Sequence, residues 1–378
     1  MDEQTKQAVA ALREAIAVAS KGLIEREVLV ELVVLSAVAR QHVLVIGPPG
    51  TAKSEAVRRI SRALGGSYFE YLLGRFTEPS EIFGPVDLRK LKEGQVTVET
   101  KGMLPEAEIA FLDEVFRGST AILNTLLSLL NERRFKRGHT DIATPLKVCV
   151  GAANDLPEDP SLTAFADRFL VHVFVQPIAD PQLDNLLAAG WGLRDEVPVV
   201  ANAQTLDIVA DACSSVDMEP IRPHLSEVIR TLRFAGIPLS DRRVVQAQRL
   251  VAAAAILAGR DVATRADLWP LLYTVSTAEA QTEARTLLRG MLEGSENTAL
   301  VGAAEDASAG PAARATRLVR DAESLLEAEP AQDSEGRGPW RMRLEGVMRE
   351  VDAGFSVAAL PPELAVIRER VQAVLEAQ

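Results

Sequence analysis

The sequence predicts an α/β fold: a central parallel sheet with helices around it, followed by an all-α part. An apolar run over residues 43–46 leads into a glycine-rich turn, and a helical pattern follows over residues 55–64. A second apolar run, residues 109–112, ends at an acidic pair. From residue 182 to residue 292 apolar residues recur at helical spacing, without strand-like alternation. Short buried strands that alternate with helices are typical of parallel sheets.

The glycine-rich turn has the composition of a phosphate-binding loop. It reads Gly47-Pro48-Pro49-Gly50-Thr51-Ala52-Lys53-Ser54 and joins a predicted strand to the start of a predicted helix. In such a turn, backbone N–H groups converge on an anion and the helix dipole adds to the attraction. Lys53 is expected to reach the β- and γ-phosphates, and the Ser54 hydroxyl to ligate Mg²⁺. The turn therefore predicts a nucleoside triphosphate with its magnesium.

One position of the turn departs from the usual pattern. Ala52 stands where a glycine normally precedes the lysine. Alanine accepts helical dihedral angles but is unfavourable at positive φ. We therefore expect the helix to begin slightly earlier than usual.

The acidic pair predicts the second half of the site. Asp113 follows a run suited to a central strand, so it would lie at the carboxyl end, where open α/β sheets bind ligands. There Asp113 is expected to hold Mg²⁺ through water, and Glu114 to orient and deprotonate the attacking water. A solvated strand end is the alternative, and the apolar run leading into the pair makes it the weaker one.

Two further polar residues lie beside predicted strands. Asn154 follows the apolar run 148–153, and its amide could bond both the γ-phosphate and the attacking water without changing charge. Arg168 precedes the alternating run 171–175, and its planar fork suits a γ-phosphate bound by a neighbouring subunit. A surface ion pair with Asp167 is the alternative for Arg168.

These motifs in this order resemble the AAA+ ATPases, and the segments between them narrow the resemblance to the MoxR family, most like its RavA-type branch. The resemblance covers roughly residues 5–290. It is carried by Gly47 to Ser54, Arg75 to Pro79, Ile82 to Pro85, Gly102 to Ala107, Phe111 to Glu114, Ile122 to Leu127, Leu130 to Phe135, Ala152 to Pro157, Asp167 to Phe169 and Ser240 to Arg243.

The resemblance implies ATP and Mg²⁺ as cofactors and a role for each motif. Lys53-Ser54 is similar to the Walker A pair, and Asp113-Glu114 to Walker B. Asn154 is similar to sensor 1. Arg168 is similar to the arginine finger that acts across a subunit boundary.

The resemblance also implies roles outside these motifs. Arg242 is similar to sensor 2, the lid arginine that touches the γ-phosphate. The adjacent Arg243 is similarly basic, so it is also a candidate for sensor 2 and is expected to bind nucleotide. Leu23 and Ile24 fall in a segment that packs near adenine in related ATPases. Residues 87–100 are similar to a β-hairpin insertion, with Gly94 as the turn.

We expect three domains, which the length of 378 residues allows. Residues 1–180 would form the AAA+ nucleotide-binding domain with a helix-2 insert, and two helices would open it over residues 5–38. Residues 181–292 would form an all-α lid. Residues 293–378 would form a small C-terminal helical region.

In two parts of the last 200 residues, the sequence pattern predicts individual helices. In the lid, a helix is expected over residues 241–257, with Ser240 as its N-cap. Beyond residue 294 the chain is expected to loosen until helices near 313–328, 340–351 and 362–377, with a mobile loop over 329–338.

Charge argues against a nucleic-acid partner. The formal net charge is −12, whereas phosphate contacts by basic residues supply most nucleic-acid affinity. Residues 133–137 form a strongly basic run that could provide a local patch. A charged turn between a helix and a strand is the favoured interpretation of that run, and a pore-facing or intersubunit role is the alternative.

The remaining composition predicts a cytoplasmic protein. No stretch near residue 1 combines basic residues with an apolar segment and a cleavage site, so we expect no targeting segment, and no apolar run approaches the roughly 20 residues that span a bilayer. The two cysteines, Cys149 and Cys213, agree with a reducing compartment. Structural zinc has no support, because no cysteine–histidine cluster is present.

The resemblance implies a chaperone-like, Mg²⁺-dependent ATPase that forms a ring, a hexamer in the family, and remodels or activates an unknown client protein. A protein with a von Willebrand factor A domain is the partner that the family suggests. Two alternatives stay open: a nucleic-acid-stimulated motor with the same insertion, and a scaffold whose assembly ATP controls.

Overall fold

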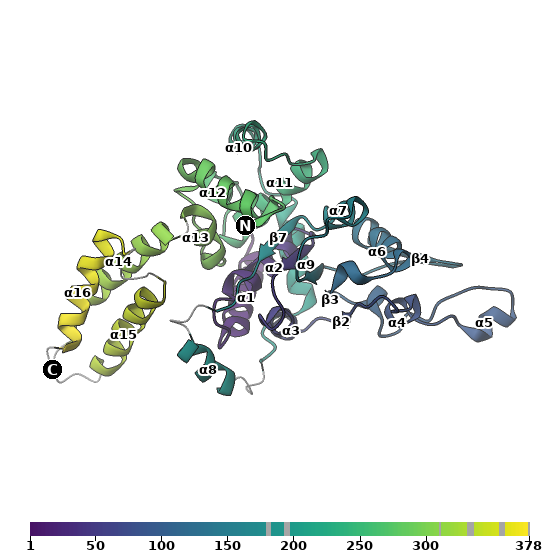
Figure 1. The fold of residues 1–378 in the computed structure, drawn as a ribbon, viewed down its shortest axis with the longest axis horizontal. Coiled ribbons are helices and arrows are strands. Elements are labelled where there is room, and N and C mark those ends of the chain that lie inside the picture. The colour runs from purple at the N-terminus through teal and green to yellow at the C-terminus, as the bar shows by residue number, and fades with distance from the viewer. Residues whose placement is uncertain (179–182, 193–196, 310, 331–335, 355–359, 377–378) are drawn as a thin grey trace.

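The protein is seen here as a computed structural model that describes residues 1–378 except 179–182, 193–196, 310, 331–335, 355–359 and 377–378. A central α/β body carries an arm on one side and a helical bundle on the other, with further helices above it (Figure 1). The expected boundary at residues 180–181 lies outside the described residues. The site lies in the central body.

Five parallel strands form the central sheet in the order β2-β3-β6-β1-β7. Four of them begin where the apolar runs predict, and β2 is an addition that the pattern did not indicate. Their bounds are β1 Val43–Ile46, β2 Tyr68–Leu72, β3 Ile109–Asp113, β6 Val148–Ala153 and β7 Val171–Phe174.

The sheet register brings three strand ends together. Strand β6 lies between β3 and β1 and pairs with both. Leu112 of β3 is opposite Gly151, and Ile46 of β1 is opposite Ala153. The residues that follow these strands therefore meet at one carboxyl edge of the sheet. These are the acidic pair, Asn154 and the glycine-rich turn.

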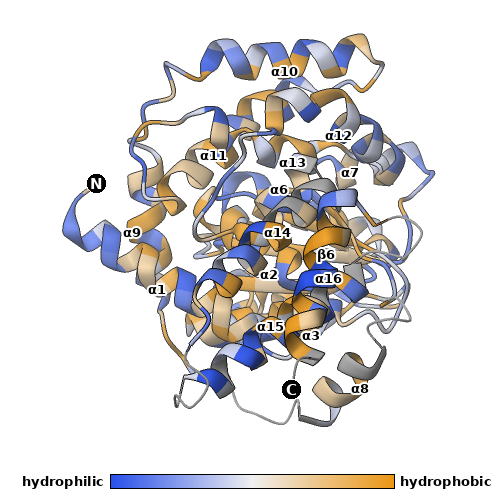
Figure 2. Ribbon diagram, turned by 90° about the vertical axis from the view of Figure 1, so that its left-hand side faces the viewer, coloured by the Kyte–Doolittle hydropathy of each residue, from blue (hydrophilic) through white to orange (hydrophobic). Residues whose placement is uncertain are grey.

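Each face of the sheet is buried under helices. Val43 and Val45 point into the larger core cluster, whereas Leu44 and Ile46 point into a second one. Figure 2 shows hydrophobic residues gathered in the middle, around α2 and β6. The helices of the first 213 residues that cover the sheet are α1 Glu3–Ser20, α2 Glu27–Val38, α3 Lys53–Leu64, α6 Thr120–Glu132, α7 Pro160–Ala166 and α9 Ala203–Cys213.

The insertion after β2 is a loop with a helical tip, not the expected hairpin. Short helices lie at Pro79–Phe83 (α4) and Leu88–Lys92 (α5). The two arms pair antiparallel only at Val86 and Val98, an isolated bridge. The helical tip forms because Asp87 caps α5, accepting from the N–H groups of Arg89 and Lys90. The expected β-hairpin over residues 87–100 is therefore replaced by a helix in its first arm.

The basic run is not a turn. Arg133 ends α6 in a left-handed conformation with φ 52°, and residues 134–137 form β4, which pairs with β5 in a two-stranded hairpin. The bounds are β4 Arg134–Arg137 and β5 Thr140–Ala143. Arg133 is directed inward, donating to the carbonyls of Leu146 and Arg40. This hairpin and the insertion form the arm in Figure 1.

The lid is helical, as expected. Helix α11 covers Asp241–Leu257, and the Ser240 side chain accepts from the Arg243 N–H, which confirms the predicted N-cap. Besides α9 and α11, the helices described between residues 181 and 292 are α8 Leu183–Gly192, α10 Arg222–Phe234 and α12 Ala278–Leu292. Short 3₁₀ turns lie in the lid at Arg265–Asp267 and Trp269–Thr274, and in the nucleotide-binding part at Leu104–Glu106 and Val115–Arg117.

The stretch after residue 294 is more ordered than expected. Helix α13, Val301–Ala309, packs on α2, where its small residues Ala303, Ala304 and Ala307 are buried. Three later helices share a separate hydrophobic cluster. Their bounds are α14 Pro311–Glu327, α15 Arg337–Gly354 and α16 Pro362–Glu376. Residues 331–335 of the predicted mobile loop lie outside the described residues.

Candidate active site

Close packing shapes the glycine-rich turn. The Gly47 N–H donates to the Ala153 carbonyl, which ties the turn to the end of β6. A Cβ at Gly47 would lie 2.2 Å from the Val175 carbonyl oxygen, so no other residue fits without a shift. Gly50 has φ 78°, a conformation that glycine adopts at no steric cost. Both glycines are thus required by the path of the loop.

Ala52 corrects the expectation drawn from the sequence. It has φ 58° and ψ 26°, in the left-handed region, and α3 begins only at Lys53. An earlier helix start was therefore wrong. A left-handed alanine costs roughly 1–2 kcal/mol, so neighbouring contacts must hold this conformation in place.

Lys53 lies at the centre of the site. Its side chain is buried, and Nζ donates to the carbonyls of Gly47 at 2.6 Å and Pro48 at 2.9 Å. Burial lowers the pKa of Lys53, while the charges of Asp113 and Glu114 act in the opposite direction. The lysine of the first motif therefore lies within electrostatic range of the carboxylates of the second.

Glu114 is held by two partners. Its Oε1 accepts from Asn154 Nδ2 at 2.9 Å, and its Oε2 pairs with Arg117 Nε at 3.2 Å. The backbone at Glu114 is left-handed, with φ 51°, and its N–H donates to Asp113 Oδ1. A non-glycine residue in this region stores strain, which is common at functional sites. The structure thus brings Asn154 to the predicted base.

The donors around the loop suit magnesium bound together with a phosphate. Ser54 and Asp113 are half-buried and offer a hydroxyl and a carboxylate, the oxygen ligands that Mg²⁺ prefers. Among the described residues, no three His, Cys, Asp or Glu side chains gather closely enough to hold a metal ion. Mg²⁺ usually keeps waters and takes phosphate oxygens. This donor set fits such a shared ion.

The two residues expected near adenine differ in exposure. Leu23 is buried in the main hydrophobic cluster, and Ile24 is half-buried. Leu23 is therefore a core residue in this structure, and of the two, Ile24 keeps a surface that a base could contact.

Arg168 lies at the amino-terminal end of the strands, opposite the glycine-rich turn. Val171, the first residue of β7, pairs with Val43, the first residue of β1. Arg168 comes before Val171 in the chain, at the amino-terminal end of the strands. The glycine-rich turn follows the carboxyl end of β1. The two are therefore separated by the length of the four residues of β1, about 13 Å at roughly 3.3 Å per residue. Its Nη1 lies 4.0 Å from Asp167 Oδ2.

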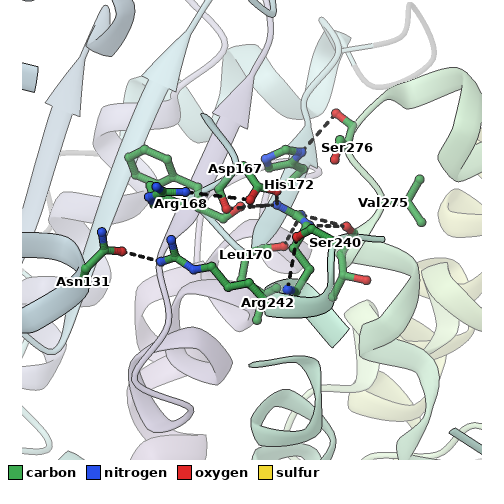
Figure 3. A network of polar contacts seen from close by, with 12 residues as sticks. Asn131, Asp167, Arg168, Leu170, His172, Ser240, Arg242, Val275 and Ser276 are labelled. Atoms are coloured by element: carbon green, nitrogen blue, oxygen red, sulfur yellow. Dashed lines mark hydrogen bonds and ion pairs between the residues drawn. The ribbon is translucent and has the colours of Figure 1, made fainter. Parts of the chain in front are cut away.

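Arg242 lies near Arg168 and is not directed toward Lys53. Figure 3 shows its guanidinium directed toward Asn131, with a hydrogen bond to Asn131 Oδ1. Burial lowers the pKa of Arg242, and the neighbouring Arg168 charge lowers it further. Arg242 is therefore directed at Asn131 and not at the phosphate loop of its own chain, and its contact with a γ-phosphate stays a prediction.

Arg243 is a structural residue in this arrangement. It is 2% exposed, and its guanidinium donates to the carbonyls of Leu170 at 2.7 Å and Thr274 at 2.7 Å. Its Nη1 also pairs with Asp167. The expectation that Arg243 binds nucleotide is wrong here, since its donors are already engaged by the chain. Consecutive residues point to different sides of a helix, which separates it from Arg242.

Two residues near the site carried no signal in the sequence. Arg26 is buried against the phosphate loop, and Arg117 pairs with Glu114. Neither belongs to a motif with a known chemical role. Only the tertiary contacts reveal them.

Comparison with known proteins identifies similar chains. A family model described as the MoxR domain in the MoxR-vWA-beta-propeller ternary systems matches residues 10–212, more than half of the chain. A model of the AAA lid domain matches residues 218–285. Together the two matches span the sheet, the insertion and the lid.

Individual relatives agree with these matches. The uncharacterized protein MJ0812 of Methanocaldococcus jannaschii is 36% identical over 249 residues, 65% of this chain and 66% of that protein. The match thus spans just under two thirds of that relative. The chaperone MoxR1 of Mycobacterium tuberculosis is 24% identical over 271 residues, 66% of this chain and 70% of that protein.

A solved structure shares the fold. The crystal structure of a proposed ATPase from Cytophaga hutchinsonii superposes with a TM-score of 0.63 and 17% identity, covering 78% of this chain and 97% of that one. At this identity the likeness concerns the fold alone. Within the described residues, no helix has the length and apolar character needed to cross a bilayer.

Proposed function

Because this chain belongs to the MoxR family of AAA+ ATPases, we propose that it hydrolyses ATP with Mg²⁺ as part of a ring, a hexamer, that remodels or activates a client protein. The observation that carries the proposal is the meeting of Lys53, Asp113, Glu114 and Asn154 at one sheet edge. Those groups are what in-line hydrolysis of a phosphoric anhydride needs.

Each residue has a distinct task. Lys53 would exchange the Gly47 and Pro48 carbonyls for phosphate oxygens, which are better partners for an ammonium group. Ser54 and Asp113 would hold Mg²⁺, which neutralises charge on the phosphates. Glu114 would take the proton from the attacking water, and Asn154 would orient that water and donate to the γ-phosphate.

Assembly into a ring would explain the positions of Arg168 and Arg242, which are separated from the phosphate loop of their own chain. Arg168 and Arg242 lie near each other, and Arg168 precedes β7 at the end of the strands opposite the phosphate loop. In a ring, that end would face the phosphate loop of the next subunit. Two guanidinium groups kept side by side repel each other, and an anionic γ-phosphate between them would relieve the repulsion. We propose this shared site as the link between hydrolysis and assembly.

The partner proposal rests on the family. The matching family model is described from systems that combine MoxR, vWA and β-propeller proteins. We propose a von Willebrand factor A domain protein as the partner of this ring, with the client protein as the target that the two act on. Nucleic acid is a poor candidate for the client because the chain carries a net charge of −12.

Replacing Glu114 with Gln tests the proposal. The variant should bind Mg²⁺-ATP and keep the ring assembled but turn ATP over at least about a hundredfold more slowly, since the base is lost while the shape is kept. Bound nucleotide and ring mass are measured together with turnover. Arg117→Gln serves as the matched control, because it removes the salt-bridge partner of Glu114 and leaves the carboxylate.

Undiminished turnover in Glu114→Gln would exclude Glu114 as the base. Turnover that rises with added DNA or RNA and falls with salt would favour the nucleic-acid motor. Client activation that persists in the ATP-locked variant would favour the scaffold, because a remodelling motor needs hydrolysis.

A further inference from the structure

Arg26 joins three segments of the chain at the phosphate loop. It lies between α1 and α2 and is 5% exposed. Its Nε donates to the Thr51 carbonyl at 2.7 Å, and its Nη2 donates to the Gln176 carbonyl at 2.8 Å. Its Nη1 donates to the carbonyl of the adjacent Glu25. One buried guanidinium thus ties the α1–α2 connection, the phosphate loop and the exit from β7.

The bond to Thr51 controls the direction of the next N–H group. In a trans peptide the C=O and N–H bonds point in opposite directions. Arg26 holds the Thr51 carbonyl, so the N–H of Ala52 points away from Arg26. In a phosphate loop the backbone N–H groups are the ligands of the anion. The orientation of this peptide is therefore part of the binding site.

Ala52 makes this control necessary. It follows Thr51 directly and has φ 58°, which a glycine would adopt freely but an alanine does not. Without a partner for the Thr51 carbonyl, rotation of the peptide would let Ala52 return to negative φ. The Ala52 N–H would then leave the direction that the loop requires.

We infer that Arg26 is a positioning residue for the nucleotide: it holds the Thr51–Ala52 peptide so that the phosphate loop is formed before ATP binds. This inference rests on the proposed function, because it concerns the same site. We assign Arg26 no contact with the phosphates, since each of its three guanidinium nitrogens donates to a backbone carbonyl.

Arg59 offers a matched control. It is also 5% exposed and donates to two backbone carbonyls, Ala19 at 2.9 Å and Lys21 at 2.7 Å. It supports the start of the same α1–α2 connection but donates no bond to the phosphate loop. Loss of Arg59 should therefore reproduce the general effect of removing a buried arginine.

The test compares Arg26→Met with Arg59→Met in the full chain. Affinity for Mg²⁺-ATP is measured by calorimetry, and hydrogen exchange of residues 50–53 is measured without nucleotide. Arg26→Met should bind at least about tenfold more weakly, as expected for loss of a charged hydrogen bond that forms the site, and its loop amides should exchange faster. Arg59→Met should lower the unfolding temperature and keep wild-type affinity.

A double-mutant cycle with Ala52→Gly tests the mechanism. In the Ala52→Gly background, Arg26→Met should cost about threefold or less in affinity, because glycine does not drive the peptide toward negative φ. An equal loss in both backgrounds would overturn the role assigned to Ala52. If Arg26→Met does not fold, Arg26→Lys is measured in its place, with the same expected order.

Failure of the inference differs from failure of the proposed function. If wild type binds Mg²⁺-ATP and Arg26→Met binds within about twofold of it, with unchanged exchange at residues 50–53, Arg26 is not a positioning residue. The same holds if Arg59→Met weakens binding as much. If wild type itself binds no Mg²⁺-ATP, the proposed function fails first.

Discussion

Asn154 Nδ2 donates to Glu114 Oε1 at 2.9 Å, joining the ends of two neighbouring strands. The contact sets the carboxylate of the proposed base before any water is bound. In the proposed mechanism, it also holds a neutral amide beside the position of the γ-phosphate. Small changes at this pair should therefore act on turnover more than on binding.

Replacing Asn154 with Ala should lower kcat by about a hundredfold or more, the usual effect of removing a donor to developing charge. The affinity for Mg²⁺-ATP should change by less than about threefold, because Lys53 and the loop are untouched. Steady-state turnover and calorimetry separate the two quantities. Equal losses in kcat and affinity would contradict a role confined to the transition state.

Gly47→Ala should destabilise the protein by about 1–3 kcal/mol, the usual cost of overpacking. The added methyl would lie 2.2 Å from the Val175 carbonyl oxygen, so the loop or β7 must shift. Gly290→Ala in α12 is the matched control, because nothing lies within 4 Å of its added Cβ. A helical alanine there should stabilise by up to about 1 kcal/mol. Denaturant unfolding measures both, and similar effects would refute the packing argument.

Arg168→Ala subunits should be complemented by Lys53→Ala subunits. Each variant alone lacks one half of every proposed shared site, so turnover should be low in both. A mixture contains interfaces at which an intact phosphate loop meets an intact Arg168. Turnover should therefore recover on mixing, and no recovery would mean that Arg168 does not act between subunits.

We expect the free energy of unfolding to depend on pH because of the buried Glu31. It is 6% exposed and accepts from the N–H groups of Gly302 and Ala303, which begin α13. Burial raises the pKa of Glu31 from 4.5 to about 7, and the charges of Glu27 and Glu305 add to the rise. The folded state thus holds this proton more tightly than the unfolded state does.

The sign of the effect follows from proton linkage. Because the unfolded chain releases the Glu31 proton first, stability should fall as pH rises from 4.5 to about 7. The loss is about 3 kcal/mol for a shift of this size. In Glu31→Gln that fall should be absent, so the free energies of unfolding of the two proteins should diverge with pH. Parallel profiles would contradict the raised pKa.

Local patterns predicted most of the chemistry. The runs 43–46 and 148–153 appear as strands β1 and β6, because they are continuous apolar segments of strand length. Ser240 caps α11 as its type predicts. The MoxR resemblance is confirmed by the family match, whereas its RavA-type branch and the roles of individual residues stay predictions.

Patterns that depend on distant contacts were missed or misread. Ala52 adopts positive φ in a loop that Arg26 contacts from 25 residues away. Arg242 and Arg243 are equivalent in sequence, yet one reaches Asn131 and the other is buried among carbonyls. Helix α13 looked loose because alanines and glycines carry little apolar signal, but small side chains allow its close packing on α2.

The sequence by itself determined which groups are the candidates for binding and catalysis: a phosphate loop, an acidic pair, an amide and arginines, each marked by its own neighbours in the chain. Tertiary structure decided where these groups lie. Glu114 meets Asn154 because β3 and β6 are adjacent in the sheet, and Arg242 lies beside Arg168 because the lid packs at the other edge. Local motifs follow from short-range sterics and hydrogen bonding, whereas strand order and lid placement follow from burial of surfaces far apart in the chain.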